Sequence, residues 1–210
     1  MTFLYIETNF LIGYAKNQDQ DAETLIRDFH SLQPLKIFIP SICCMESFSV
    51  LEGEKKRRKE FEQGLNREIK TLQGNINSVY SKQICKDFQT AIVNNQRMTN
   101  DIESRLFKAL DWISKYAELI DLEKSILLKS INTILIPDPT DNLILTSILN
   151  HSKQDLAATK VFLSNNSKDF GKEEIKELLK KAGISKYLTS TKDFLGWLKT
   201  QHPANTSQIS

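Results

Sequence analysis

Four carboxylates occupy segments of the sequence that otherwise carry no charge. Glu7 is the only charged side chain in MTFLYIETNFLIGYA, Glu46 in IFIPSICCMESFSVL, and Asp138 and Asp141 in INTILIPDPTDNLILTSILN. An ionised carboxylate in apolar surroundings is costly unless it is paired or binds a metal ion. Carboxylate oxygens suit Mg²⁺ and Mn²⁺, and no cluster of histidines or cysteines competes for a softer metal. The sequence therefore predicts a divalent-metal site built from distant carboxylates.

Each of these acids also has a simpler structural role open to it. Asp138 precedes a proline and can cap a helix whose third residue is Asp141, and for Asp138 capping is favoured over ligation. Glu46 can pair with a buried arginine, although no basic residue lies near it in sequence, and Glu7 can be a solvated loop residue. For Glu7, Glu46 and Asp141 the metal site is favoured. Asp169, which follows SNNSK, can equally complete the site or begin a helix.

Alternating strands and helices would bring these acids together. We expect strands at residues 3–6, 36–39, 118–122, 159–164 and 184–188, with helices at 21–32, from 41 onward, and at 123–132, 139–151, 172–182 and 191–200. Such alternation predicts an α/β fold of three layers, with a central parallel sheet of four to five strands. Ligands of these sheets bind beyond the carboxyl ends of the strands, which is where Glu7 and Asp169 fall.

Residues 52–117 differ in character, because charge density rises and strand signals vanish. Apolar residues recur at alternating four- and three-residue spacing, at Leu65, Ile69, Leu72, Ile76 and Val79, and again at Ile102, Leu106, Ala109, Ile113 and Ala117. This pattern predicts two long helices packed as a hairpin. A structural insertion that buries its own seam is the favoured interpretation, and a clamp for a substrate or partner is the alternative. We expect a single domain over residues 1–201 and a frayed tail at 202–210.

Composition sets few limits on function. The chain has 210 residues and a formal net charge of +2, which neither indicates nor excludes a polyanionic partner. Cys43, Cys44 and Cys85 match neither a disulfide framework nor a paired metal motif, so we expect reduced thiols. No secretory segment, membrane span or Gly-rich phosphate loop is recognisable. We expect a cytoplasmic protein that does not bind membranes.

The order of these motifs resembles that of the PIN-domain family of metal-dependent ribonucleases. In chain order, the four motifs of that family are matched by Glu7-Thr8-Asn9, by Glu46 in IPSICCMESFSVLE, by Asp141 in PDPTDNLILTSIL and by Asp169-Phe170 in SNNSKDF. The match covers nearly the whole chain except the helical insertion. No single motif is specific, but their order and their apolar settings together favour this family.

The resemblance implies a function and a set of site residues. Glu7, Glu46 and Asp141 would form the core of the metal site, completed by Asp138 or Asp169. A metal-bound water would then attack RNA and leave a 5′ phosphate and a 3′ hydroxyl. Neighbouring polar side chains would orient these ligands rather than act as nucleophiles, namely Thr8, Asn9, Asn142, Ser164 and Asn166.

Two positions depart from the family pattern. Glu7 stands where the family usually has aspartate, and its extra methylene changes the geometry of ligation. Asn166 stands where the family usually has an acid, and it contributes no charge. A degenerate domain that binds RNA or protein without catalysis is therefore an alternative function. A second alternative is a toxin or defence nuclease controlled by a partner, with the helical insertion as the partner's binding surface.

A run of basic residues follows Glu46 on the same expected helix. The run consists of Lys55, Lys56, Arg57, Arg58 and Lys59. Such a run is usually a solvated helix face, but its position beside the expected site also favours contact with phosphates. Phosphate contacts position a substrate without reading its sequence, so we expect RNA, or single-stranded nucleic acid in general, to be bound with weak sequence preference.

Overall fold

The computed structural model describes residues 1–32, 34–75, 77–154 and 157–201. The expected tail at 202–210 and the expected seam residue Ile76 lie outside these described residues.

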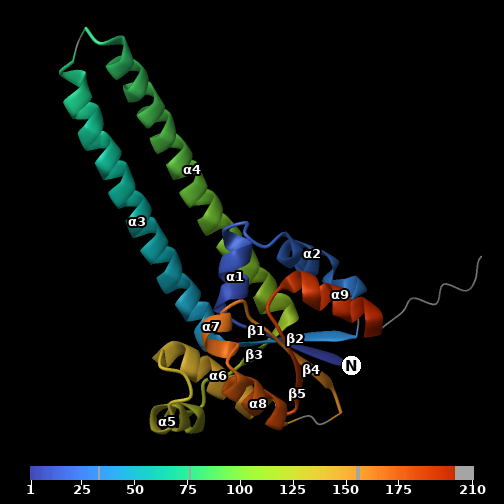
Figure 1. Ribbon diagram of the computed structural model, residues 1–210. Helices are drawn as coiled ribbons and strands as arrows, with labels where there is room; N and C mark the ends of the chain where they lie inside the picture. Colours follow the sequence, from blue (N-terminus) through green and yellow to red (C-terminus); the bar gives the residue numbers. More distant parts are fainter. Residues whose placement is uncertain (33, 76, 155–156, 202–210) are drawn as a thin grey trace, which may run out of the picture.

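A five-stranded parallel sheet forms the centre of the molecule (Figure 1). Its strands are β1 (Thr2–Ile6), β2 (Leu35–Pro40), β3 (Ala117–Ile120), β4 (Thr159–Leu163) and β5 (Ile184–Leu188), in the order β3-β2-β1-β4-β5. Every residue of the central strand β1 is buried, as expected for a parallel strand covered on both faces. The predicted parallel sheet is confirmed.

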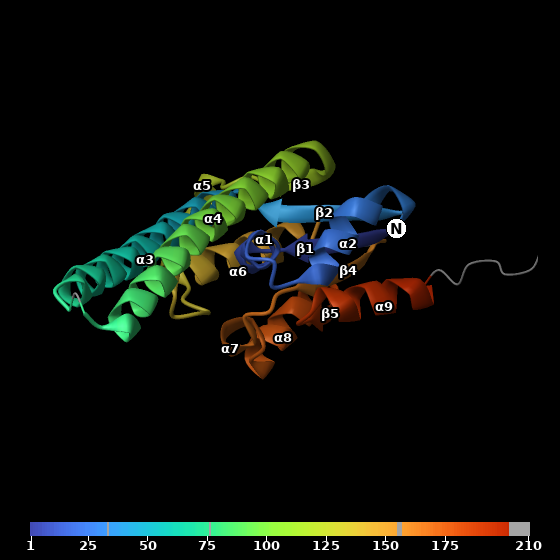
Figure 2. The same cartoon turned by 90° about the horizontal axis from the view of Figure 1, so that it is seen from above.

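Helices cover both faces of this sheet (Figures 1 and 2). One face carries α1 (Thr8–Ala15), α2 (Gln20–Asp28) with the 3-10 turn η1 (Phe29–Ser31), and α9 (Thr191–Gln201). The other face carries α6 (Pro139–His151), against which α5 (Lys124–Asn132) packs, and α8 (Glu173–Lys181). The predicted three-layer arrangement is confirmed. Helix α1 and the short helix α7 (Ser167–Phe170) were not expected from the sequence.

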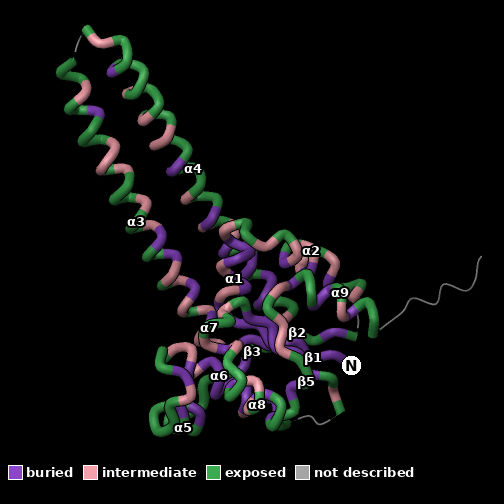
Figure 3. The backbone as a smooth tube through the Cα atoms, viewed as in Figure 1, coloured by how far each residue is buried: buried purple, intermediate pink, exposed green. Residues whose placement is uncertain are grey.

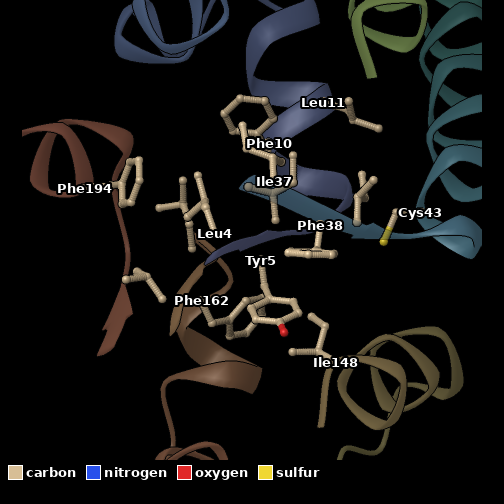
Figure 4. Packing of buried hydrophobic residues seen from close by; sticks show 14 of the residues in the cluster. Leu4, Tyr5, Phe10, Leu11, Ile37, Phe38, Cys43, Ile148, Phe162 and Phe194 are labelled. Atoms are coloured by element: carbon tan, nitrogen blue, oxygen red, sulfur yellow. The ribbon is translucent and has the colours of Figure 1, made fainter. Parts of the chain in front are cut away.

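The core forms two layers because successive side chains of a strand point to opposite faces of the sheet. Figure 4 shows Leu4 of β1 on the side of α1 and Phe10, whereas the next residue, Tyr5, points toward Phe162 and Ile148 on the opposite side. All five side chains are buried. The core therefore fixes the register of the strands, and with it the positions of the residues that follow them.

A long helical hairpin projects from the domain (Figures 1 and 2). It consists of α3 (Ser41–Gln73) and α4 (Val79–Tyr116). The helix that carries Glu46 and the first arm of the hairpin are one continuous element, so no element boundary exists near residue 52. Figure 3 shows that burial is concentrated at the base of the hairpin. The expectation that Val79 belongs to the buried seam was wrong, because its side chain is 76% exposed.

None of the helices in the described ranges is both long enough and apolar enough to cross a membrane.

Candidate active site at the carboxyl edge of the sheet

The strand order places a topological switch point between β1 and β4. The chain adds β2 and β3 on one side of β1 and then returns to add β4 and β5 on the other. At such a switch point the connections leave in opposite directions, and ligands of parallel sheets bind in the space between them. Glu7 directly follows β1, and the segment from Ser164 to Asp169 follows β4.

Glu7 is held at the start of α1, where it acts as the N-cap. The backbone N–H of Asn9 donates to its Oε2 at 2.7 Å. The side chain is buried, and Oε1 has no hydrogen-bond partner among the described residues, although the nearby Ser164 hydroxyl acts to lower the pKa of this carboxyl. Burial raises the pKa of Glu7 to about 7, and the charges of Asp141 and Glu46 add to this effect.

Glu46 lies in the second turn of α3, which begins immediately after β2. The Thr8 hydroxyl donates a hydrogen bond to its Oε2. Cys43 is buried one turn earlier; burial raises the pKa of its thiol, and the negative charges of Glu7 and Glu46 raise it further. No arginine or lysine pairs with Glu46 among the residues that the structure describes. The alternative in which Glu46 pairs with a buried arginine is therefore not realised there.

Asp138 and Asp141 are placed by the N-terminus of α6. Asp138 is exposed and caps the helix, since its Oδ1 accepts the backbone N–H of Thr140 at 2.9 Å and that of Asp141 at 3.1 Å. Asp141 is half-buried and accepts a hydrogen bond from Asn166 Nδ2 at 3.0 Å. Burial raises the pKa of Asp141 to about 6, with further contributions from Asp138, Glu46 and Asp169.

The segment after β4 closes the cluster. Asn166 caps α7 by accepting the backbone N–H of Asp169 at 3.3 Å, while its amide nitrogen binds Asp141. The Asp169 carboxylate lies 3.5 Å from the Lys172 ammonium. Asp169 does not begin a helix, because it is the third residue of α7, but it lies near enough to Asp141 to raise the pKa of that residue.

The side-chain hydrogen bonds of Asn142 within the described residues go to α5 and the loop before α6, not to the carboxylates. Its Oδ1 accepts the backbone N–H groups of Leu135 and Ile136 at 2.8 and 3.2 Å, and its Nδ2 donates to the carbonyls of Ser130 and Thr133. These bonds fix the loop that leads into the N-terminus of α6. Asn142 therefore positions Asp138 and Asp141 through the backbone.

Tyr187 on β5 is a residue of this site that the sequence did not indicate. Its hydroxyl donates to the Ser164 carbonyl at 3.0 Å. Burial raises its pKa to about 12, and the charge of Glu7 contributes. Tyr187 lies in an ordinary strand pattern, so only the pairing of β4 with β5 reveals its position.

The cluster has the donor chemistry of a divalent-metal site. Glu46 and Asp141 lie near enough to Glu7 to raise its pKa, the pKa of Asp141 is also raised, and one buried oxygen of Glu7 has no hydrogen-bond partner among the described residues. Across residues 1–32, 34–75, 77–154 and 157–201, however, no three acidic, histidine or cysteine side chains are spaced to enclose an ion as they stand. The carboxylate oxygens are suitable ligands for a hard cation, and to bind one the side chains would have to move closer together.

The basic run does not form one free cationic surface. Lys55 lies 2.6 Å from Glu103 and 3.2 Å from Glu52. Arg57 and Arg58 both pair with Glu54, at 2.5 and 2.8 Å. In the described part of the chain, the exposed side chains of Lys56 and Lys59 have no ion-pair partner, so these two residues carry the run's free charge.

Fold and site together define a three-layer α/β protein with a carboxylate cluster at the switch point of a parallel sheet. The sequence profile described as PIN domain matches residues 4–170, which is most of the chain. The protein belongs to the PIN-domain family. PIN domains are generally nucleases, typically use divalent metals and act on nucleic acids. A comparison with curated proteins gives no match.

Proposed function

We propose that the protein is a divalent-metal-dependent endoribonuclease that uses Mg²⁺ or Mn²⁺. The observation that carries the proposal is that Glu46 and Asp141 lie near enough to Glu7 to raise its pKa, while none of the three has a basic partner among the described residues. Buried or half-buried carboxylates that repel one another are stabilised by a cation, and perturbed groups of this kind favour a functional site. The family's general nuclease activity supports the same conclusion.

In this proposal each core carboxylate has a supporting group. Asn9 holds Oε2 of Glu7 and leaves Oε1 for the ion, Thr8 orients Glu46, and Asn166 orients Asp141. Asp138 or Asp169 completes the ligand set. When bound, the cation supplies a water of lowered pKa and stabilises charge on the phosphodiester.

The substrate would approach from the side of the hairpin. Lys56 and Lys59 lie on α3, the helix that also carries Glu46, and they would contact backbone phosphates. Lys55, Arg57 and Arg58 would contribute from the same helix, weakened by their acidic partners. We place this activity in the cytoplasm, where the free thiols Cys43, Cys44 and Cys85 stay reduced.

Cleavage of a labelled mixed RNA pool tests the proposal. Wild type should cut with Mn²⁺ or Mg²⁺ and not with EDTA. Asp141→Asn should lower the rate by roughly 100-fold or more, because a ligand is lost. The matched control is Asp193→Asn, an exposed residue of α9, which should cut like wild type. Equal cutting by wild type and Asp141→Asn would refute the assigned site.

A non-catalytic PIN-like module is the second candidate. It is favoured by Asn166 in place of an acid, and by the lack of a ready-made three-ligand group in the described part of the chain. This module would bind RNA without cutting it, and Mn²⁺ would not raise its thermal midpoint. In the partner-controlled alternative, a protein would cover the hairpin, whose tip exposes Val79 and Tyr80 at 76% and 83%.

A further inference from the structure

Helix α5 turns an apolar face to the solvent (Figure 3). Ile126 and Ser130, four residues apart, form its buried side, whereas Leu128 and Ile131 on the other side are 49% and 65% exposed. Exposed apolar side chains also precede and follow the helix, so that the whole set comprises Leu119, Leu122, Leu127, Leu128, Ile131 and Ile134. Single exposed apolar residues are normal, but a concentration of this kind marks an interaction surface.

An apolar groove lies beside this face, between α5, the loop that follows it and the start of α6. Its volume is about 360 Å³, and its apolar walls include Ile42, Leu127, Ile131, Ile134 and Leu143. None of the lining residues in the described ranges is charged, and the amide of Asn142 is already engaged in the hydrogen bonds that fix the loop. The groove therefore suits aliphatic side chains and not a charged ligand.

Ile131 and Ile134 belong to both features of this surface. They line the groove, and they are also 65% and 77% exposed, so they form an apolar lip at its edge. When two copies of such a surface are related by a two-fold axis, the lip of each copy can enter the groove of the other. A two-fold interface uses the same patch on both chains and therefore requires this self-complementarity.

The charges around this face have both signs. Asp121 and Glu123 precede α5, and Lys124 and Lys129 lie on it. All four side chains are exposed, and none of them belongs to an ion pair in the part of the chain that the structure describes. A polyanion or an anionic membrane would meet the two acids as well as the two lysines. A second copy of the chain supplies a partner for both signs.

We propose that the protein forms a two-fold symmetric dimer through α5 and the groove beside it, with a second copy of the chain as the occupant. The interface lies next to the candidate site, because Pro137 and Pro139 line the groove and flank Asp138. The second copy thus covers the loop that leads into the N-terminus of α6. The inference does not depend on the proposed nuclease function.

Ile134→Glu separates the dimer from the fold. Ile134 is 77% exposed, so a carboxylate at this position stays solvated in the single chain and becomes buried only in the dimer. The matched control is Val79→Glu at the start of α4, since Val79 is 76% exposed but lies at the tip of the hairpin. Circular dichroism melts of both variants should resemble that of wild type.

The first measurement is sedimentation velocity of the full chain at increasing concentration. For wild type and Val79→Glu, the mass should rise from that of one chain toward that of two between about 1 and 100 µM, and Ile134→Glu should raise Kd at least about tenfold. A single-chain mass of wild type throughout would overturn the dimer and leave the face to a different partner. Equal association of wild type and Ile134→Glu would place the contact elsewhere and also overturn the proposal.

The second measurement tests the match of charges. Lys124→Glu combined with Lys129→Glu leaves only acids around the face, so two copies should repel each other. Kd should rise several-fold at about 50 mM salt and return toward the wild-type value at about 500 mM salt, because salt screens exposed charges. The control is Lys82→Glu combined with Lys86→Glu, two exposed positions of α4. Equal Kd values for the two double variants at low salt would contradict the proposed interface.

Discussion

At the scale of single residues, Glu7 shows that the site carries a cost in stability. The residue is 2% exposed, one of its carboxylate oxygens has no hydrogen-bond partner among the described residues, and burial raises its pKa to about 7 from 4.5. Folded Glu7 therefore binds a proton more tightly than unfolded Glu7 does. The stabilising contribution of protonated Glu7 to the free energy of unfolding is therefore complete below about pH 4.5 and is lost as the pH rises through 7.

Glu7→Gln should therefore stabilise the metal-free protein. Glutamine can still accept the Asn9 N–H, and it avoids burying a charge at pH 8. We expect the free energy of unfolding in EDTA to rise by about 1–3 kcal/mol, measured by urea denaturation. The same variant should lose the stabilisation that Mn²⁺ gives to wild type. Glu177→Gln, an exposed residue of α8, is the control. A less stable Glu7→Gln variant in EDTA would contradict the prediction.

Asn166→Asp restores an acid where the family usually has one, and two opposite effects should follow. The new charge would face Asp141, whose pKa is already raised to about 6, so the thermal midpoint in EDTA should fall. The added carboxylate should also increase the rise in midpoint caused by Mn²⁺. Thermal melts with EDTA or Mn²⁺ measure both effects. The control is Asn94→Asp on the exposed side of α4, and an unchanged response to Mn²⁺ would count against the placement of Asn166.

At the scale of elements, α1 connects the site to the base of the hairpin. Glu7 caps its first turn, and Lys16 at its other end lies 3.1 Å from Glu54 of α3. Arg105 of α4 donates to the Tyr14 carbonyl at 3.0 Å and stacks on the Tyr14 ring. The two arms of the hairpin thus hold the end of α1 that lies away from Glu7.

The ion pairs of Glu54 predict how this attachment depends on pH. Hydrogen bonds from Arg57 and Lys16 hold the pKa of Glu54 at about 2, although burial opposes them. The group therefore stabilises the fold above its unfolded pKa of about 4.5, and this contribution is lost as the pH falls toward 2.

Glu54→Gln removes the charge that pairs with Arg57, Arg58 and Lys16, so it should lower the free energy of unfolding at pH 7. The loss should be limited to about 1–2 kcal/mol, because Arg57 is exposed and its ion pair is screened by solvent. The difference from wild type should shrink steadily between about pH 4.5 and pH 2, as measured by urea denaturation at each pH. Glu60→Gln lies on the same helix at an exposed position and should show no such trend. A difference that stays constant with pH would argue against the assigned ion pairs.

At the scale of the whole molecule, the hairpin divides into a packed base and a projecting distal part (Figure 3). Near the base, Ile102, Leu106, Ala109 and Ile113 are buried and join the main core. Farther out, helix α3 is mostly exposed and buries Ile69 on its inner side. The distal part therefore adds little to the stability of the domain.

Deletion of residues 66–91, with a short Gly-Ser link between the arms, should leave the domain folded. The bonds of Asn95 to Arg58 and Glu62 are retained in this variant and keep the shortened arms together. We expect a cooperative thermal transition within about 5 °C of that of the full chain, measured by circular dichroism. Loss of cooperative unfolding would show that the distal hairpin is part of the core.

The sequence by itself determined the layers of the fold and the positions of the acids relative to the strands. Buried strands and amphipathic helices leave a local periodic signal, so the parallel sheet and the long hairpin were predictable. Glu7 directly follows β1, and Asp141 lies in the first turn of α6; these placements were predictable because they depend on neighbours along the chain.

Only the tertiary structure decided which distant groups meet. Asn166 bonds to Asp141, and Tyr187 supports Ser164, because β4 lies between β1 and β5. Lys55 is neutralised by Glu103 because the two arms of the hairpin pack side by side. No periodicity within one segment records such pairings, since they depend on strand order and helix packing. The free charge of the basic run and the apolar groove beside α5 are therefore properties of the assembled fold.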